Sequence, residues 1–129
     1  MTTYRDIVNQ ALRELGVLHS GEVANGDEGA NGLTALNQML NSWIYEGIDL
    51  EHTTATGLTD TLPYPDDHHS AFAYNLAMRL APQFGVTPSP VLIAMSAQGF
   101  RYMQGRYLKI KPLSVDLGLR WNPNRDTMI

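Results

Sequence analysis

Cysteine is missing from this sequence of 129 residues. Its absence excludes disulfide bridges, zinc fingers that use thiolate ligands, and cysteine nucleophiles. Long apolar runs are missing as well, since none approaches the ~20 residues that a membrane-spanning helix needs. The N-terminal residues 1–6, Met-Thr-Thr-Tyr-Arg-Asp, also lack the basic and apolar regions of a signal peptide. We therefore expect a protein that is made and used in a cytoplasm and does not bind a membrane.

The sequence also lacks the motifs of several common enzyme classes. It contains no Gly-x-x-x-x-Gly-Lys-Ser/Thr loop, no Gly-x-Gly-x-x-Gly and no Gly-x-Ser-x-Gly. Carboxylates of the type that glycosidases use stand at Glu22, Glu46, Asp49 and Glu51. Nothing in their spacing marks one of them as a general acid, so we expect no catalytic residue and no cofactor. A cell-wall hydrolase that uses acids near Glu22 or Glu46 is kept as an alternative.

Residues 66–69, Asp-Asp-His-His, contain groups that can bind metals. On a helix, however, only residues three or four apart share a face, which leaves Asp66 with His69. Two ligands make a poor site unless His19 or His52 converges on them through the fold. We therefore expect no metal, and we interpret one of the two aspartates as the cap of a helix at the positive end of its dipole.

Charge is distributed unevenly along the chain, whose net charge is −4. Residues 1–78 contain two basic and eleven acidic side chains, whereas residues 79–129 contain seven basic and two acidic ones. Such polarity favours an electrostatic interaction surface. The alternative, with about even odds, is that both charges spread over a folded surface and partly neutralise each other.

Four basic residues lie between positions 101 and 111, interleaved with Tyr102 and Tyr107, and are here called the basic patch. Its members are Arg101, Arg106, Lys109 and Lys111. Bases at this spacing can follow phosphates, so a small helical DNA-binding protein is a further alternative. Because the chain is acidic overall and has no zinc finger, RNP sequence or obvious helix-turn-helix, we favour a solvated face or a protein contact for this patch.

Apolar periodicity predicts two helices in the first half. The first begins at a capping box of Thr3 and Asp6, ends at Gly16, and buries residues at helical spacing between Tyr4 and Leu15. The second is expected from an Asp27 cap to Gly47, and its apolar stripe is Leu33, Leu36, Leu40, Trp43 and Ile44.

Two more helices are predicted in the second half. The third follows the aspartates at 66 and 67, and its stripe is Phe72, Ala73, Leu76, Ala77 and Leu80. The fourth runs from about Ser89 to Tyr107, with Pro90 in its first turn. Its residues at helical spacing are Val91, Met95, Gly99, Tyr102 and Arg106.

Two segments do not have a helical pattern. Residues 48–65 contain five threonines from position 53 to position 61 and close with Pro63 and Pro65, which favours a short β-hairpin or a long loop. Residues 111–129 are extended in character and include Trp121 in a polar context. The fold we predict is all-α: an antiparallel bundle of about four helices in residues 1–110, with the insert at about 48–65 and an extended C-terminal arm at 111–129.

The first half resembles a known family. The relevant segments are residues 11–18, Ala-Leu-Arg-Glu-Leu-Gly-Val-Leu, then Gly21-Glu22, and above all residues 32–43, Gly-Leu-Thr-Ala-Leu-Asn-Gln-Met-Leu-Asn-Ser-Trp. They look like the head-to-tail adaptors of tailed bacteriophages, which include the packaged-DNA-stabilisation proteins of short-tailed phages. The resemblance covers roughly residues 4–105. Gly26, Gly29 and Gly32 stand where that family often has alanine.

The resemblance implies a structural virion protein rather than an enzyme. Such adaptors form a ring, usually of twelve copies, beneath the portal protein at one capsid vertex. They are assembled in the host cytoplasm, lengthen the DNA channel, retain the packaged DNA and offer a surface to tail or tail-adaptor proteins. An acidic first half and a basic second half suit head-to-tail contact between neighbouring copies.

The resemblance also assigns roles to the C-terminal residues. The arm would bind the portal, with Trp121 as anchor, Arg120 and Arg125 as charge partners, and apolar contacts from Leu113, Val115 and Leu117. Alternating apolar residues of this kind can add a strand to a partner's sheet, although the arm can also pack back on its own bundle. The basic patch would face a neighbouring subunit or the packaged DNA in the channel.

Overall fold

The computed structural model describes residues 2–19 and 21–108. Four α-helices make up most of this part: α1 (Tyr4–Glu14), α2 (Gly26–Ser42), α3 (His69–Leu80) and α4 (Pro90–Arg106). Two short 3₁₀ helices, η1 (Trp43–Glu46) and η2 (Asp66–His68), extend α2 and precede α3. No β-strand is formed within these residues, so the predicted helical class and the four helices are confirmed. The predicted arm, residues 111–129, lies outside the described residues.

Local sequence signals set most of the helix ends. The Thr3 backbone N–H donates to Asp6 Oδ2 at 2.9 Å and the Asp6 N–H donates to Thr3 Oγ1 at 3.3 Å, which confirms the capping box. Ser89 caps α4 by accepting from the Leu92 N–H at 3.1 Å, which agrees with the predicted start of this helix at about Ser89. Gly47 ends η1 in the left-handed region, with φ of 85°, where a residue without a Cβ has no steric cost.

Two predicted caps are wrong. The N-cap of α2 is Asn25 and not Asp27, because Asn25 and Glu28 form a reciprocal capping box two residues earlier. Neither Asp66 nor Asp67 caps α3, which continues directly from η2 without a side-chain cap. Asp67 instead binds charged and phenolic donors on α4, and charge-assisted hydrogen bonds of that kind are stronger than neutral ones.

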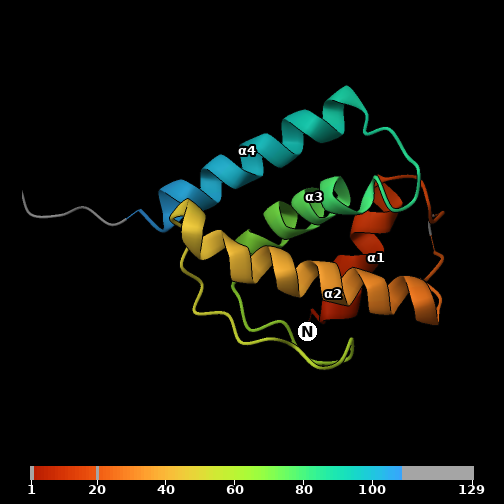
Figure 1. Ribbon diagram of the computed structural model, residues 1–129, viewed down its shortest axis with the longest axis horizontal. Helices are drawn as coiled ribbons and strands as arrows, with labels where there is room; N and C mark the ends of the chain where they lie inside the picture. The colour runs from red at the N-terminus through yellow and green to blue at the C-terminus, as the bar shows by residue number, and fades with distance from the viewer. Residues whose placement is uncertain (1, 20, 109–129) are drawn as a thin grey trace, which may run out of the picture.

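Helix α3 lies at the centre and packs against α1, α2 and α4. Figure 1 shows α3 between α2 and α4, running opposite to both, while α1 crosses them steeply. The predicted stripe of α3 is buried at each of its positions, Phe72, Ala73, Leu76, Ala77 and Leu80. The stripes of α1 and α2 complete one core, to which Ile7, Leu12, Leu36, Met39 and Leu40 contribute fully buried side chains. Ile44, predicted on the α2 stripe, is instead 52% exposed.

The residues noted at helical spacing along α4 are not the ones that the helix buries. The buried residues are Leu92, Ser96 and Met103, whereas Val91 is 71% exposed and Tyr102 is 47% exposed. The buried residues are offset by one position from the residues noted at helical spacing. One position corresponds to a rotation of about 100° on a helix. Both sets contain apolar side chains, so the periodicity does not discriminate between them. The polar Ser96 is accommodated because its hydroxyl donates to the Ile93 carbonyl at 2.8 Å.

The insert at 48–65 is a long loop that wraps back to the start of α1. Its contacts with the N-terminal segment are backbone hydrogen bonds, from the Arg5 N–H to the Leu58 carbonyl and from the Leu62 N–H to the Thr2 carbonyl, both at 2.9 Å. An isolated antiparallel bridge joins Thr3 and Thr61, but the described residues contain no hairpin strands. Of the two predicted alternatives for this segment, the long loop is the one observed.

Candidate functional site

The segment that carries the family resemblance builds the core of the protein. Leu36, Met39, Leu40 and Trp43 are all buried. Trp43 packs against Phe72 of α3 and Phe100 of α4, with ring centroids 5.8 and 5.7 Å apart. The resemblance therefore rests largely on residues that pack the core.

Asn37 of the same segment holds the long loop. Its Oδ1 accepts from the Ala55 N–H at 3.0 Å and from His52 Nε2 at 2.9 Å, and its Nδ2 donates to the Ala55 carbonyl at 3.0 Å. His52 Nδ1 is left to accept from the Tyr64 hydroxyl. This arrangement requires neutral His52, and burial lowers the pKa of its imidazole.

A second polar network joins η2 to the end of α4. The Asp67 carboxylate accepts from the Tyr102 hydroxyl at 2.6 Å and pairs with Arg106 Nε at 3.2 Å. The fully buried His68 places Nδ1 2.8 Å from Asp67 Oδ1 and Nε2 2.6 Å from the Tyr107 hydroxyl. The hydrogen bond from Tyr102, together with His68 and Arg106, holds the pKa of Asp67 below its usual range. The network anchors the last turn of α4, from which the chain continues towards residue 109.

The basic patch is only partly within the described residues. Arg101 is exposed on α4. Arg106 is engaged in the ion pair with Asp67. Lys109 and Lys111 lie outside the described residues, as do the arm positions Leu113, Val115, Leu117, Arg120, Trp121 and Arg125.

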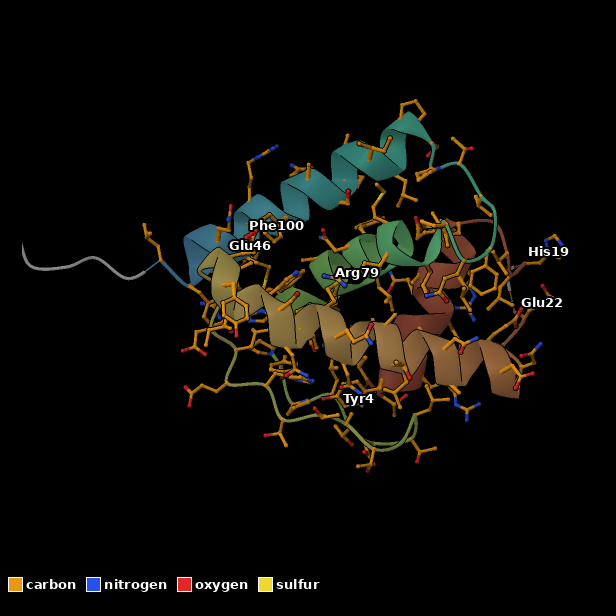
Figure 2. All side chains as sticks on the ribbon, in the orientation of Figure 1. Tyr4, His19, Glu22, Glu46, Arg79 and Phe100 are labelled. Carbon is orange, nitrogen blue, oxygen red and sulfur yellow. The ribbon has the colours of Figure 1, made fainter. Side chains whose placement is uncertain are left out.

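Two of the carboxylates considered for a hydrolase, Glu22 and Glu46, do not come together. Glu22 closes the loop before α2, where its carboxylate accepts from the His19 N–H at 2.6 Å. Figure 2 shows Glu22 and Glu46 at opposite ends of the molecule, so they do not form a pair across one bond. Glu46 and Asp49 line a shared hollow of about 580 Å³ beside Tyr107 and Leu108.

The four residues at 66–69 do not make a metal site. Asp66 lies 3.9 Å from His69, while Asp67 and His68 are engaged in the network with α4. Among residues 2–19 and 21–108, no group of three or more His, Asp or Glu side chains is arranged to hold a metal ion.

Exposed apolar side chains gather on two surfaces. The first, here called the α4 surface, consists of Val91, Met95 and Tyr102, with Arg101 and the Asp67 carboxylate beside them. The second, the η1 surface, consists of Ile44, Tyr45 and Leu108, with Glu46 beside them. Tyr45 is 87% exposed, an unusual position for a large aromatic ring. Sequence reasoning placed Val91, Met95 and Tyr102 on one face of a helix but did not identify that face as exposed.

No model of a known protein family matches this chain, and no curated protein is significantly similar to it. In the part of the chain that the structure describes, no helix has both the length and the apolar character needed to cross a bilayer.

Proposed function

We propose that this protein is a structural virion component that forms a ring beneath the portal of a tailed bacteriophage. In that role it extends the DNA channel, retains packaged DNA and joins the head to the tail. The proposal treats α1 to α4 as one adaptor bundle with residues 111–129 as its portal-binding arm. The resemblance of residues 32–43 to head-to-tail adaptors motivates it.

The observation that carries the proposal is the pair of exposed apolar surfaces, each with charged side chains beside it. Arg101 and Asp67 lie beside the α4 surface, and Glu46 lies beside the η1 surface. Two different surfaces that complement each other make a heterologous contact, and such contacts close into rings when the rotation between copies allows. Exposed apolar side chains rimmed by charge are typical of protein interaction sites.

The test is to mix the purified protein with the portal protein from the same genome. Negative-stain imaging and native mass measurement should show portal particles that gain a ring and a mass increment of a whole number of subunits. Met95→Glu on the α4 surface and Tyr45→Glu on the η1 surface should each abolish the ring. Thr34→Glu is the matched control, because Thr34 is exposed on α2 outside both surfaces.

Two outcomes would count against the proposal. Portal and protein that remain separate at high concentration would remove the portal contact. A ring that forms equally well with Met95→Glu and Tyr45→Glu would show that other surfaces join the copies. In the first case, peptidoglycan turbidity and gel-shift assays would test the hydrolase and DNA-binding alternatives.

A further inference from the structure

A hollow of about 580 Å³ lies where η1 meets the last turn of α4, at the point where the described part of the chain ends. Figure 1 shows the end of α2, which η1 extends, beside the end of α4. The Gln104 side chain of α4 joins the two, because its Nε2 donates to the Glu46 carbonyl at 3.1 Å. Leu108, the last described residue, is itself part of the wall. The sequence that follows Leu108 therefore starts at this hollow.

Two apolar side chains in the wall are exposed to solvent. Ile44 is 52% exposed and Leu108 is 68% exposed. Trp43 and Ile48, on either side of the 44–47 segment, are buried, so η1 meets the core on one side and presents Ile44 to solvent on the other. Covering Ile44 and Leu108 would remove apolar surface from water, which favours an occupant with apolar side chains of its own.

The charged side chains in the wall are both acidic, Glu46 and Asp49. Glu46 also lines a neighbouring groove that contains Arg79, but no ion pair within 4.0 Å joins the two. Arg106, in the last turn of α4, is paired with Asp67. Among the described residues, no basic side chain lines the hollow. Its field is therefore negative and favours a basic occupant.

The sequence after Leu108 suits the hollow in both respects. Residues 109–113 are Lys-Ile-Lys-Pro-Leu, which combine two bases with apolar side chains. In an extended chain successive side chains point to opposite sides, so two lysines at alternate positions can meet an acidic wall while Ile110 faces an apolar one. Five extended residues span about 16 Å, which is long enough to cross a hollow of this volume.

We propose that residues 109–113 bind back into this hollow of their own chain, where the two lysines meet the acidic wall and Ile110 covers the exposed apolar side chains. The covalent connection selects this occupant over a second copy or a separate peptide. A segment joined to its site by a short linker has an effective concentration in the millimolar range, on the order of 1 mM or above. Docking of this segment leaves residues 114–129 available to a partner and fixes the direction in which they leave the bundle.

The absence of cysteine makes disulfide cross-linking a direct test. The double variant Ile44→Cys/Leu113→Cys places one thiol in the hollow and one at the end of the segment. When the full chain is oxidised mildly at low protein concentration, we expect an intramolecular disulfide, detected by faster migration on a non-reducing gel and by peptide mapping. Arg101→Cys/Leu113→Cys is the matched control, because Arg101 is exposed on α4 about two turns before Leu108 and does not line the hollow. This pair should cross-link about tenfold more slowly.

Charge reversal tests the role of the acidic wall. Adding Glu46→Lys to the Ile44/Leu113 cysteine pair should slow the cross-link about threefold, and Lys111→Glu should do the same. The two reversals together should restore most of the rate. Glu46→Lys leaves the hydrogen bond from Gln104 in place, because that bond ends on the backbone carbonyl of Glu46. Circular dichroism of each variant confirms that the helices are retained.

Three outcomes would overturn the proposal. A disulfide that forms between two chains would show that the segment docks on a second copy. Equal rates for the two cysteine pairs would show that the segment does not bind in the hollow. Rates unaffected by either charge reversal would remove the acidic wall from the proposal. The experiment uses the protein alone, so its failure is distinguishable from a failure to bind the portal.

Discussion

At the scale of single residues, Gly32 of α2 is the described glycine with the least room for a side chain. A Cβ at this position would lie 2.4 Å from Val8 Cγ1, far inside van der Waals contact. Val8 is fully buried on α1, and a β-branched side chain has few rotamers with which to move away. Glycine at this position therefore allows α1 and α2 to approach closely, although it lowers the intrinsic helix propensity of α2.

Replacing Gly32 with alanine should destabilise the protein. The overpacking cost exceeds the gain in helix propensity, and we expect a net loss of about 1–2 kcal/mol in the free energy of unfolding, measured by urea denaturation. Gly26→Ala is the control, since no atom lies within 4 Å of a Cβ there and its effect should stay within about 0.5 kcal/mol. Adding Val8→Ala to Gly32→Ala should recover part of the loss. A Gly32→Ala protein as stable as the unmodified one would show that the helices can separate freely.

His52 should make stability depend on pH. Its folded pKa is lowered from the model-compound value of 6.5, so the unfolded chain binds the proton first as pH falls. The stabilising contribution is fully present above about pH 6.5 and is lost as pH falls from there towards the folded pKa. His52→Gln should reduce the decline in the free energy of unfolding between about pH 7.5 and 5. His19→Gln, which changes an exposed histidine, serves as the comparison. If the free energy of unfolding falls equally with pH in the unmodified protein and in both variants, the assignment to His52 is wrong.

At the scale of elements, the Asp67 network anchors the last turn of α4. Asp67→Asn removes the charge that attracts Arg106 and weakens the hydrogen bond from Tyr102. We expect faster amide hydrogen exchange at residues 103–108, while α1 and α2 keep their protection. Asp66→Asn is a matched control, because Asp66 is fully exposed and its carboxylate lies 3.9 Å from His69 of α3. Unchanged exchange in Asp67→Asn would mean that apolar packing alone holds the end of α4.

Helix α4 also illustrates how far an element can be predicted from its sequence. Ser89 and Pro90 are local signals, and they set its start correctly. Its inner face depends on which stripe meets α3, and both stripes contain apolar residues. Leu92, Ser96 and Met103 face inward in the folded protein, and Val91, Met95 and Tyr102 are left on the surface.

At the scale of the whole molecule, the residues that the structure describes form one hydrophobic core. Helices α1 to α4 share this cluster of buried apolar side chains. Removing residues 109–129 should therefore change the free energy of unfolding by less than about 1 kcal/mol, as for other substitutions outside a core. If the arm assignment is correct, the same truncation should abolish portal binding, measured by co-sedimentation. A truncated protein that binds the portal as well as the full chain would remove the arm from the proposal.

The helical class, the four helices and most of their ends follow from the sequence by itself. These features depend on interactions between residues a few positions apart, such as the Thr3–Asp6 capping box and the stripe of α3, and such spacing can be read directly. The long loop was one of two alternatives, because its threonines suit an extended chain whether or not it forms a hairpin.

Only the tertiary structure decided which partners meet across distant elements. Asp67 binds Tyr102 and Arg106 instead of capping its own helix, and Asn37 reaches 18 residues along the chain to Ala55. These features depend on how helices are oriented in space, and a one-dimensional pattern of apolar residues does not contain that orientation.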